Sequence, residues 1–483
     1  MEKIVSVELP NLWLLLPEMA VLFTGFLLFT LDLFYRRLNH TLAISVSVVG
    51  YLIAFLLLLF NWDLKGETFY GLYHRDGFST LLQAFMLLFT MALLGFTYAY
   101  YRHRRSLYGE FYYILNFALV GGMFLVSSYN LVVLYVALEA VSIAFYIMIA
   151  LLRSDFNSKE GAFKYLMLGG LSIALASYGA GFMYIYAGSL DLRHILTHTG
   201  ENQYFLVLGL VLFLLGFAVK IGAVPFHFWL PDAYQGAPTP ITAYMASAGK
   251  LAFFAPIVRL MPYVQEHFAP AWITTVSVIS AVTMLYGNLT ALVQKDVKRL
   301  LAYSSIAHSG YILAGIAAAE VIGLKAVIYF LLAYSLMGFG SFLVLALMER
   351  VPGWENRLEQ FSGLRFSVPW LAFSFMVLLL ALLGVPPTVG FVGKALVFMA
   401  LSFEELWWLA FAMIVATGIS TGYYLKITAL MFMEERREAF VPAPSTGEKV
   451  LLLLITAGVV LLGAVPIILW NLVSLSASNL FVR

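Results

Sequence analysis

The chain has 483 residues, of which 62% are hydrophobic and only 11% are charged, and its formal net charge is +2. Soluble domains carry about 45–50% apolar and about 25% charged residues, so this composition predicts an integral membrane protein and excludes a soluble domain. The small net charge gives no indication of a nucleic-acid partner, and the absence of cysteine excludes disulfides and cysteine-ligated iron–sulfur clusters in this chain.

Apolar segments long enough to cross about 30 Å of hydrocarbon follow one another along the whole chain. In chain order, we predict fourteen spans at 12–35, 43–62, 78–100, 111–127, 130–151, 162–187, 203–231, 240–263, 271–292, 299–319, 323–348, 369–400, 407–432 and 449–475. No soluble domain fits between them. We therefore expect an all-α integral membrane protein with a single polytopic membrane domain over residues 1–483.

The distribution of Lys and Arg predicts the orientation of these spans. If the N-terminus lies outside, most Lys and Arg residues fall in cytoplasmic loops, as the positive-inside rule requires. The outer loops then hold only a few cations, among them Arg75, Arg193 and Arg259. An even number of spans places the C-terminus outside as well.

Four charged residues lie near the centres of predicted spans. They are Glu139, Lys220, Lys250 and Lys394. A charge at the bilayer centre costs about 2.5–3.5 kcal/mol on insertion scales, so it persists where it faces the protein interior, finds a partner or has a function. One carboxylate cannot neutralise three ammonium groups, and burial disfavours the charged form of lysine. This combination predicts a proton relay; the alternative is a set of structural ion pairs or snorkelling side chains.

Helix-breaking residues accompany two of these lysines. Pro225 interrupts the span 203–231, and Pro386 and Pro387 interrupt the span 369–400. Unpaired backbone at membrane depth is tolerated only inside protein or beside water, so we expect discontinuous seventh and twelfth spans next to hydrated sites. The twelfth span comes five spans after the seventh, and this odd offset makes the two halves of the chain inverted repeats.

His308 lies in the middle of the tenth predicted span, in "LLAYSSIAHSGYILAGIAA". A histidine is suited to proton transfer near neutral pH, but a neutral histidine bonded to Ser or Tyr on a neighbouring turn is an equally good reading of this sequence. No P-loop, Rossmann glycine pattern, metal-ligand cluster or serine-nucleophile motif is present. ATP-driven transport and soluble-type catalysis are therefore not expected.

Three long motifs occur in order along the chain: "KIGAVPFHFWLPDAYQGAPTP", "QKDVKRLLAYSSIAHSGYI" and "GVPPTVGFVGK". They resemble the proton-translocating, antiporter-like membrane subunits of respiratory complex I and of multisubunit cation/proton antiporters. The resemblance covers nearly the whole chain. The lysine after "GFVG", together with "PDAYQGAP", "MASAGK" and "RDGFS", is similar to the subunit N branch of NADH-quinone oxidoreductase.

This resemblance implies an architecture and a set of roles. Inverted repeats of five helices are expected at 111–263 and 271–432, after an N-terminal three-helix segment at 1–105 and before a C-terminal helix at 449–483. Glu139 and Lys220 are expected to form a charge pair, Lys250 to be a central relay and Lys394 to be the terminal exchange site. In the family, a line of such charges and waters crosses the membrane midplane, and quinone reduction elsewhere in the complex drives it.

The implied function is that of a non-redox, proton-translocating subunit of NADH-quinone oxidoreductase, without independent catalytic activity. The subunit is expected to bind no cofactor, with NAD, FMN, iron–sulfur clusters and quinone in other subunits. Expected partners are the neighbouring subunit M, small subunits such as K, and lipid of the bacterial inner membrane, with both termini on the periplasmic side. The alternatives are a subunit of a multisubunit cation/proton antiporter and a scaffold that only anchors redox subunits.

Overall fold

The computed structural model describes residues 9–34, 39–104, 109–200, 202–318, 320–435 and 441–481, which form a bundle of long helices. The first half contains η1 (Leu12–Leu15), α1 (Leu16–Phe34), α2 (His40–Phe60), β1 (Gly66–Thr68), β2 (Tyr73–Arg75), α3 (Gly77–Arg104), α4 (Glu110–Val126), α5 (Leu131–Ile149), α6 (Phe156–Ala187), α7 (Leu192–Thr197), α8 (Gln203–Ile221), α9 (Trp229–Gly236), α10 (Thr239–Tyr244) and η2 (Met245–Gly249). The second half contains α11 (Lys250–Leu292), α12 (Val297–Ala317), α13 (Val321–Met348), η3 (Leu358–Phe361), α14 (Leu364–Ser367), α15 (Pro369–Leu383), α16 (Val389–Phe403), α17 (Trp407–Met433), α18 (Thr446–Ala464) and α19 (Ile467–Phe481).

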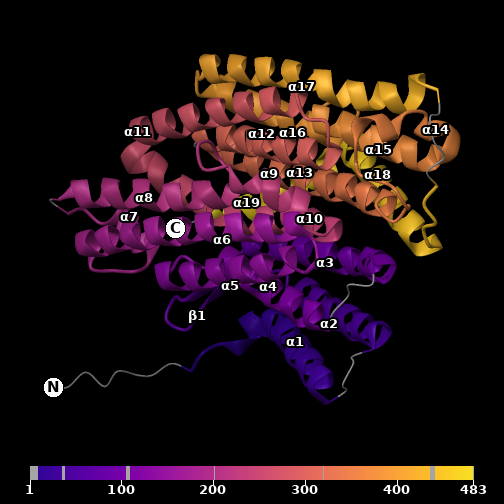
Figure 1. The fold of residues 1–483 in the computed structure, drawn as a ribbon. Helices are drawn as coiled ribbons and strands as arrows, with labels where there is room; N and C mark the ends of the chain where they lie inside the picture. The colour runs from indigo at the N-terminus through magenta and orange to yellow at the C-terminus, as the bar shows by residue number, and fades with distance from the viewer. Residues whose placement is uncertain are drawn as a thin grey trace, which may run out of the picture.

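The helices lie side by side across the bundle (Figure 1). α1 and α2 form one edge of it and α17 lies at the opposite edge, so the chain advances across the bundle from one side to the other. The C-terminal helices return across the bundle, where α19 packs against α3 and α13, and α18 packs against α13 and α16. The C-terminal helix α19 therefore connects α3, near the start of the chain, with α13 in its second half.

Each of the fourteen predicted spans coincides with helix. Among the described residues, twelve helices are long and apolar enough to cross a membrane. Shorter apolar helices account for the remaining predicted spans, including Glu110–Val126, Pro369–Leu383 and Val389–Phe403. The prediction of a helical, multi-pass membrane protein is confirmed, and so are the discontinuities in the seventh and twelfth spans.

Some predicted boundaries are wrong. The single C-terminal helix at 449–475 is two helices, α18 and α19, which are separated at Val465 and Pro466. Proline has no backbone N–H to continue the helix, which explains the interruption. The loop expected between 263 and 271 is helical, because α11 continues from Lys250 to Leu292 with Pro262 and Pro270 inside it.

A small β-hairpin is the one strand-containing feature of the described residues, and it was not predicted. β1 and β2 pair antiparallel, with Gly66 opposite Arg75 and Thr68 opposite Tyr73. The backbone N–H of His74 donates to the carbonyl of Ser127, just after α4 (2.7 Å). The hairpin therefore lies against the ends of the helices of the first half.

The same backbone pairing occurs once in each half. In the first, Leu131 N donates to Leu190 O (2.9 Å) and Leu192 N to Tyr129 O (3.0 Å), at the starts of α5 and α7. In the second, Val297 N donates to Asn356 O (2.8 Å) and Leu358 N to Lys295 O (2.9 Å), at the starts of α12 and η3. The start of α12 is five spans further along the chain than the start of α5, and this odd offset places the two pairings at opposite faces of the membrane, as inverted repeats require.

The two broken helices also end alike. α8 ends at Gly222 and α15 at Gly384, and both glycines have a positive φ, 71° and 91°. Beyond them, Ala223 N donates to Ala218 O (2.9 Å) and Val385 N to Leu380 O (3.0 Å). A left-handed glycine followed by this bond across five residues is a common helix terminator. It leaves carbonyl groups of the last turn free for side chains in the middle of the bundle.

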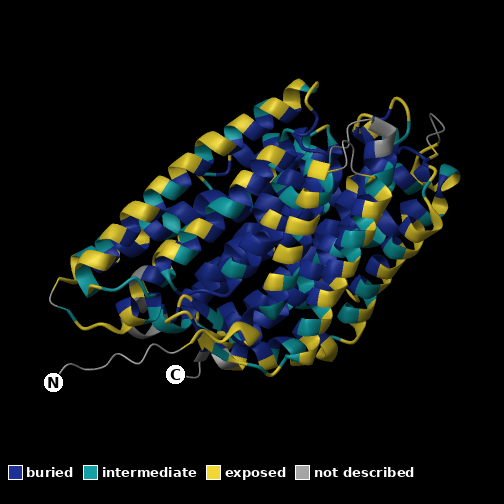
Figure 2. Ribbon diagram, turned by 90° about the horizontal axis from the view of Figure 1, so that it is seen from below, coloured by how far each residue is buried: buried dark blue, intermediate teal, exposed yellow. Residues whose placement is uncertain are grey.

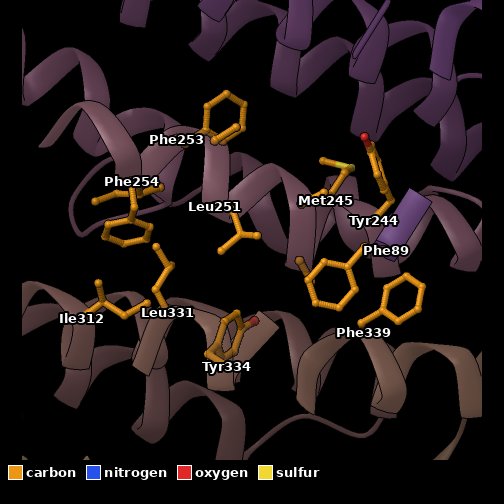
Figure 3. Packing of buried hydrophobic residues seen from close by; sticks show 14 of the residues in the cluster. Phe89, Tyr244, Met245, Leu251, Phe253, Phe254, Ile312, Leu331, Tyr334 and Phe339 are labelled. Carbon is orange, nitrogen blue, oxygen red and sulfur yellow. The ribbon is translucent and has the colours of Figure 1, made fainter. Parts of the chain in front are cut away.

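Burial increases from the edges of the bundle to its centre (Figure 2). The apolar windows of Thr239–Val264, Val297–Ala317 and Val321–Met348 are 100%, 94% and 94% buried, whereas that of Thr446–Ala464 is 28% buried. Figure 3 shows the packing at this centre, where Leu251 of α11 and Tyr334 of α13 lie opposite one another. A polar side chain on these central helices must find its partners within the protein.

Candidate functional site

Lys220 lies in the last turn of α8 and is buried. Its ammonium Nζ donates to Ser142 Oγ (2.7 Å) and Tyr146 OH (3.2 Å) and lies 3.9 Å from Glu139 Oε1. The three partners are on α5, spaced by three and four residues, so they share one face of that helix. The expected proximity of Glu139 and Lys220 is therefore present in the structure.

Glu139 differs from Lys220 in its surroundings. The side chain of Glu139 is 30% exposed, whereas that of Lys220 is fully buried. Glu139 Oε1 faces inward and accepts no hydrogen bond from any described residue. The carboxylate therefore lies at the rim of the bundle, with one oxygen directed towards the interior.

Lys250 lies at a local irregularity of its helix. An uninterrupted span is expected here from the sequence, but residues Met245–Gly249 form the π-helix η2, and α11 begins at Lys250. Such wide turns occur frequently at functional sites. Lys250 Nζ donates to Ser305 O (2.5 Å) and Ser309 Oγ (2.7 Å), both on α12.

Ser309 connects Lys250 to the first broken helix. Its hydroxyl donates to Ile221 O (2.8 Å), which is the residue after Lys220 and the last residue of α8. The carbonyls of a last helical turn have no partner within their own helix. The break after α8 thus leaves the carbonyl of Ile221 free to accept from Ser309. The Ser309 hydroxyl in turn accepts from Lys250, so this one hydroxyl connects Lys250 to the helix end that holds Lys220.

His308 precedes Ser309 on α12. It shares the neighbour Tyr334 with Lys250 and the end of α15 with Lys394. Its Nδ1 is 2.8 Å from Ser304 O, and its Nε2 is 3.1 Å from Leu382 O, in the last turn of α15. A neutral imidazole donates to only one of these carbonyls, whereas an imidazolium donates to both. The ring is 4.9 Å from that of Tyr334, over which Lys250 Nζ also lies (4.6 Å).

Lys394 lies on α16, immediately beyond the second break. Its Nζ donates to Leu383 O (2.8 Å), the last residue of α15, and lies 4.6 Å from the centre of the Tyr311 ring. The predicted association of this lysine with the unwound segment is therefore present. His308 and Lys394 bind neighbouring carbonyls, Leu382 and Leu383, of the same helix end.

The five predicted residues form one line across the centre of the bundle. It runs from Glu139 through Lys220, Lys250 and His308 to Lys394, and the ends of α8 and α15 connect its members. Lys250 and Lys394 donate to neutral oxygens, and among the described residues neither has a carboxylate within salt-bridge distance. Ammonium groups held by neutral acceptors can lose a proton without leaving a buried carboxylate unpaired.

The side chains that lie between these residues could not be predicted from the sequence. Ser309, Tyr334 and Tyr311 connect the predicted members, and Ser142 and Tyr146 hold Lys220. Serine and tyrosine are frequent in this chain, and the sequence does not indicate which of them lie near the buried lysines. Only the adjacency of Ser309 to His308 in "AHSGY" gives a signal, and it is weak.

The prediction that Arg259 belongs to an outer loop is wrong. Arg259 is buried in α11, and its Nη1 lies 2.8 Å from Asp76 Oδ2. Its Nε and Nη2 also donate to Val126 O (2.9 and 2.7 Å). The pair joins α11 to the start of α3 and the end of α4, away from the line of lysines.

Comparison with known proteins gives consistent results over the whole chain. Residues 128–420 match the family model described as NADH:quinone oxidoreductase/Mrp antiporter, TM, and this range contains all five predicted residues. The NADH-quinone oxidoreductase subunit N 2 of Aquifex aeolicus (strain VF5) is 61% identical over 98% of this chain and 98% of its own length. The subunit N of Chlorobium chlorochromatii (strain CaD3) is 35% identical over 90% of this chain and 88% of its own length.

Solved structures agree with these relatives. A chain of respiratory complex I from Thermus thermophilus with bound aureothin superposes with a TM-score of 0.83 at 30% identity, covering 95% of this chain and 100% of that one. A chain of the Mrp complex from Dietzia sp. DQ12-45-1b has a TM-score of 0.86 at 20% identity, covers 97% of each chain and shows the same fold. The chain therefore belongs to the family of NADH-quinone oxidoreductase subunit N, within the NADH:quinone oxidoreductase/Mrp antiporter membrane subunits.

Proposed function

We propose that this chain is a proton-translocating membrane subunit of an NADH-quinone oxidoreductase and carries out no redox step itself. Protons move along the line from Glu139 to Lys394, and quinone reduction elsewhere in the complex drives the movement. The observation that supports this most strongly is the series of contacts that links three buried lysines through the ends of α8 and α15.

The geometry suits transfer driven by charge. Two unit charges at the 3.9 Å separation of Glu139 Oε1 and Lys220 Nζ interact with about 4 kcal/mol at an effective dielectric constant of about 20. A change of charge at the rim of the bundle therefore alters the energy of a proton on Lys220. Each following step requires a lysine to release its proton to a neighbour, and the hydroxyls and water beside the breaks supply the path.

The proposal also covers partners and placement. The partly exposed side of Glu139 faces a neighbouring subunit, and we expect subunit M and small subunits such as K beside this chain. NAD, FMN, iron–sulfur clusters and quinone are held by other subunits, and this chain binds no cofactor. Both termini lie on the periplasmic side of the inner membrane. The subunits that co-purify with the chain, from a quinone oxidoreductase or from a cation/proton antiporter, test this assignment against the antiporter alternative.

Replacement of Lys220 tests the proposed function. In the parent complex reconstituted into vesicles, Lys220→Met should lower the number of protons pumped per electron pair, because the first lysine of the line no longer carries a proton. Lys426→Met is the matched control, since Lys426 is exposed on α17. Full stoichiometry in an assembled Lys220→Met complex would favour the scaffold alternative, in which the buried charges are structural.

A further inference from the structure

A polar vestibule opens at the face of the bundle that holds the connections α5–α6 and α11–α12 and the segment after α13. Its volume is about 840 Å³, and the residues around it include Asp155, Asn157, Lys298, Glu349 and Asn356. A single water needs only about 10–15 Å³ of such volume, so the vestibule has room for many waters. In the predicted orientation this face is cytoplasmic.

A buried ion pair forms the floor of this vestibule. Lys298 Nζ lies 3.5 Å from Glu349 Oε1, and both side chains are 5% exposed. The same carboxylate accepts from Thr239 Oγ1 (2.6 Å), Asn356 Nδ2 (2.6 Å) and Tyr100 OH (2.7 Å). Glu349 is thus an acidic group that borders the vestibule on one side and the packed interior on the other.

Two helices lead from this floor to Lys250. Thr239 is the first residue of α10, which continues through η2 directly into Lys250. Lys298 lies in the first turn of α12, and Ser305 and Ser309 follow it by seven and eleven residues, on the same face. Ser305 O and Ser309 Oγ are the acceptors of the Lys250 ammonium group.

A polar side chain without a partner lies on this route. Ser305 is fully buried, and its Oγ has no hydrogen-bond partner among the described residues. The phenol groups of Tyr234 and Tyr334 are its neighbours. Nearly all buried polar groups are hydrogen-bonded, so a serine hydroxyl near two phenols but without a well-formed hydrogen bond marks a place for a water or for a transient proton donor.

We propose that the vestibule is the proton-uptake opening of this subunit and that Glu349 passes protons to Lys250 past Tyr234, Ser305 and Tyr334. The proposal rests on the proposed function and specifies its uptake route, which joins the line at Lys250. In each cycle a proton from vestibule water binds the Glu349 carboxylate and then moves to the neutral amine of Lys250. Glu349 returns to its carboxylate form, paired with Lys298, and no group is consumed.

Side-specific labelling of the vestibule tests the route without removing any group on it. The chain has no cysteine, so a single introduced cysteine is the one thiol of this chain. Asn157→Cys places a thiol in the vestibule, and Ser154→Cys places one three residues earlier, exposed but outside the lining. A bulky, membrane-impermeant, positively charged methanethiosulfonate reagent should then lower proton pumping in Asn157→Cys and leave Ser154→Cys unchanged. Equal pumping in both labelled variants would overturn the proposal.

Replacement of the carboxylate gives a second, independent readout. In reconstituted parent complex, Glu349→Gln should lose pumping because the amide cannot bind and release a proton, and Glu349→Asp should recover part of it. Glu355→Gln is the control, since Glu355 also borders the vestibule but its side chain is 59% exposed in a surface ion pair. A purely structural role for Glu349 predicts normal pumping in the assembled Glu349→Gln complex.

The two proposals fail in distinguishable ways. If Glu349→Gln pumps normally while Lys220→Met does not, the uptake route is wrong and the proposed function stands. If both variants pump normally, the proposed function itself is contradicted. If Glu349→Gln does not assemble, the labelled Asn157→Cys complex decides alone.

Discussion

The buried ion pair between Asp76 and Arg259 predicts a large loss of stability when one partner is removed. The guanidinium donates from Nη1 to Asp76 Oδ2 (2.8 Å) and from Nη2 to Asp76 Oδ1 (3.1 Å). Ser79 N also donates to the carboxylate (2.7 Å). Because Arg259 is on α11, the helix that begins at Lys250, the pair fixes this helix against α3. We predict that Asp76→Asn leaves a buried guanidinium without a counter-charge.

The magnitude follows from the burial of the pair. The side chains of Arg259 and Asp76 are 0% and 4% exposed. Removal of one partner from such a pair costs about 3–5 kcal/mol, because the remaining charge is uncompensated. The pair of Asp191 and Arg193 is 26–29% exposed, and exposed pairs contribute only about 0–1 kcal/mol. Asp191→Asn is therefore the matched control.

The pair also has a predicted pH dependence. Burial raises the pKa of Asp76, but the charge of Arg259 and its hydrogen bonds outweigh burial and hold this pKa below its ordinary value. A carboxyl group with a lowered pKa in the folded state contributes stability above its unfolded pKa of about 4 and loses it as the pH falls further. The difference between wild type and Asp76→Asn should thus persist at neutral pH and shrink in acid.

Heating of the purified parent complex in detergent measures the effect. The fraction of complex that stays monodisperse should fall at clearly lower temperatures for Asp76→Asn than for Asp191→Asn. The double variant Asp76→Leu/Arg259→Met should regain much of the loss, since apolar replacement of a buried pair is often neutral. Equal heat resistance of Asp76→Asn and Asp191→Asn would refute the reasoning.

The structure makes further predictions. Gly222→Ala should lower heat stability and pumping, because φ at Gly222 is 71° and the new methyl would lie 2.5 Å from a leucine side chain. The control is Gly188→Ala, where φ is 64° and the methyl would meet open space, so only the cost of the left-handed backbone, about 1–2 kcal/mol, should appear. Equal losses of heat stability in the two variants would exclude crowding at the break. Burial and then Arg259 lower the pKa of His74, so wild-type stability should fall as the pH drops below about 6.5, and His74→Gln should fall less in the same heating assay; parallel curves would contradict this. Lys394→Arg should assemble but pump poorly in vesicles, because arginine retains its proton; normal pumping would show that only its charge is needed.

The charged members of the line could be predicted from the sequence because charge is rare in apolar spans. The prolines and glycines near Lys220 and Lys394 strengthened the prediction that these two lysines are functional, and the structure shows both at helix breaks. Their connection could not be predicted. Ser309 joins α8 to Lys250 across 88 and 59 residues of chain, and such contacts depend on how helices pack rather than on local pattern.

The errors in the fold have physical causes. Pro466 lies between two apolar stretches, so hydrophobic composition predicted one span where the structure has the two helices α18 and α19. The π-helix before Lys250 is a change of hydrogen-bond register, and its residues, "MASAG", carry no pattern of their own. Arg259 lies near the outer end of the predicted span 240–263 and was counted with the outer cations; its partner, Asp76, is 183 residues away in the chain, so no local pattern indicates the pair.

The most direct test of the proton line is the number of protons pumped per electron pair by parent complex carrying Lys250→Arg. Arginine keeps the positive charge beside Ser305 and Ser309 but does not release its proton in proteins. We predict an assembled complex with reduced stoichiometry in vesicles, and full stoichiometry in the exposed control Lys426→Arg. Full stoichiometry in Lys250→Arg would show that Lys250 is a fixed charge and would contradict the relay.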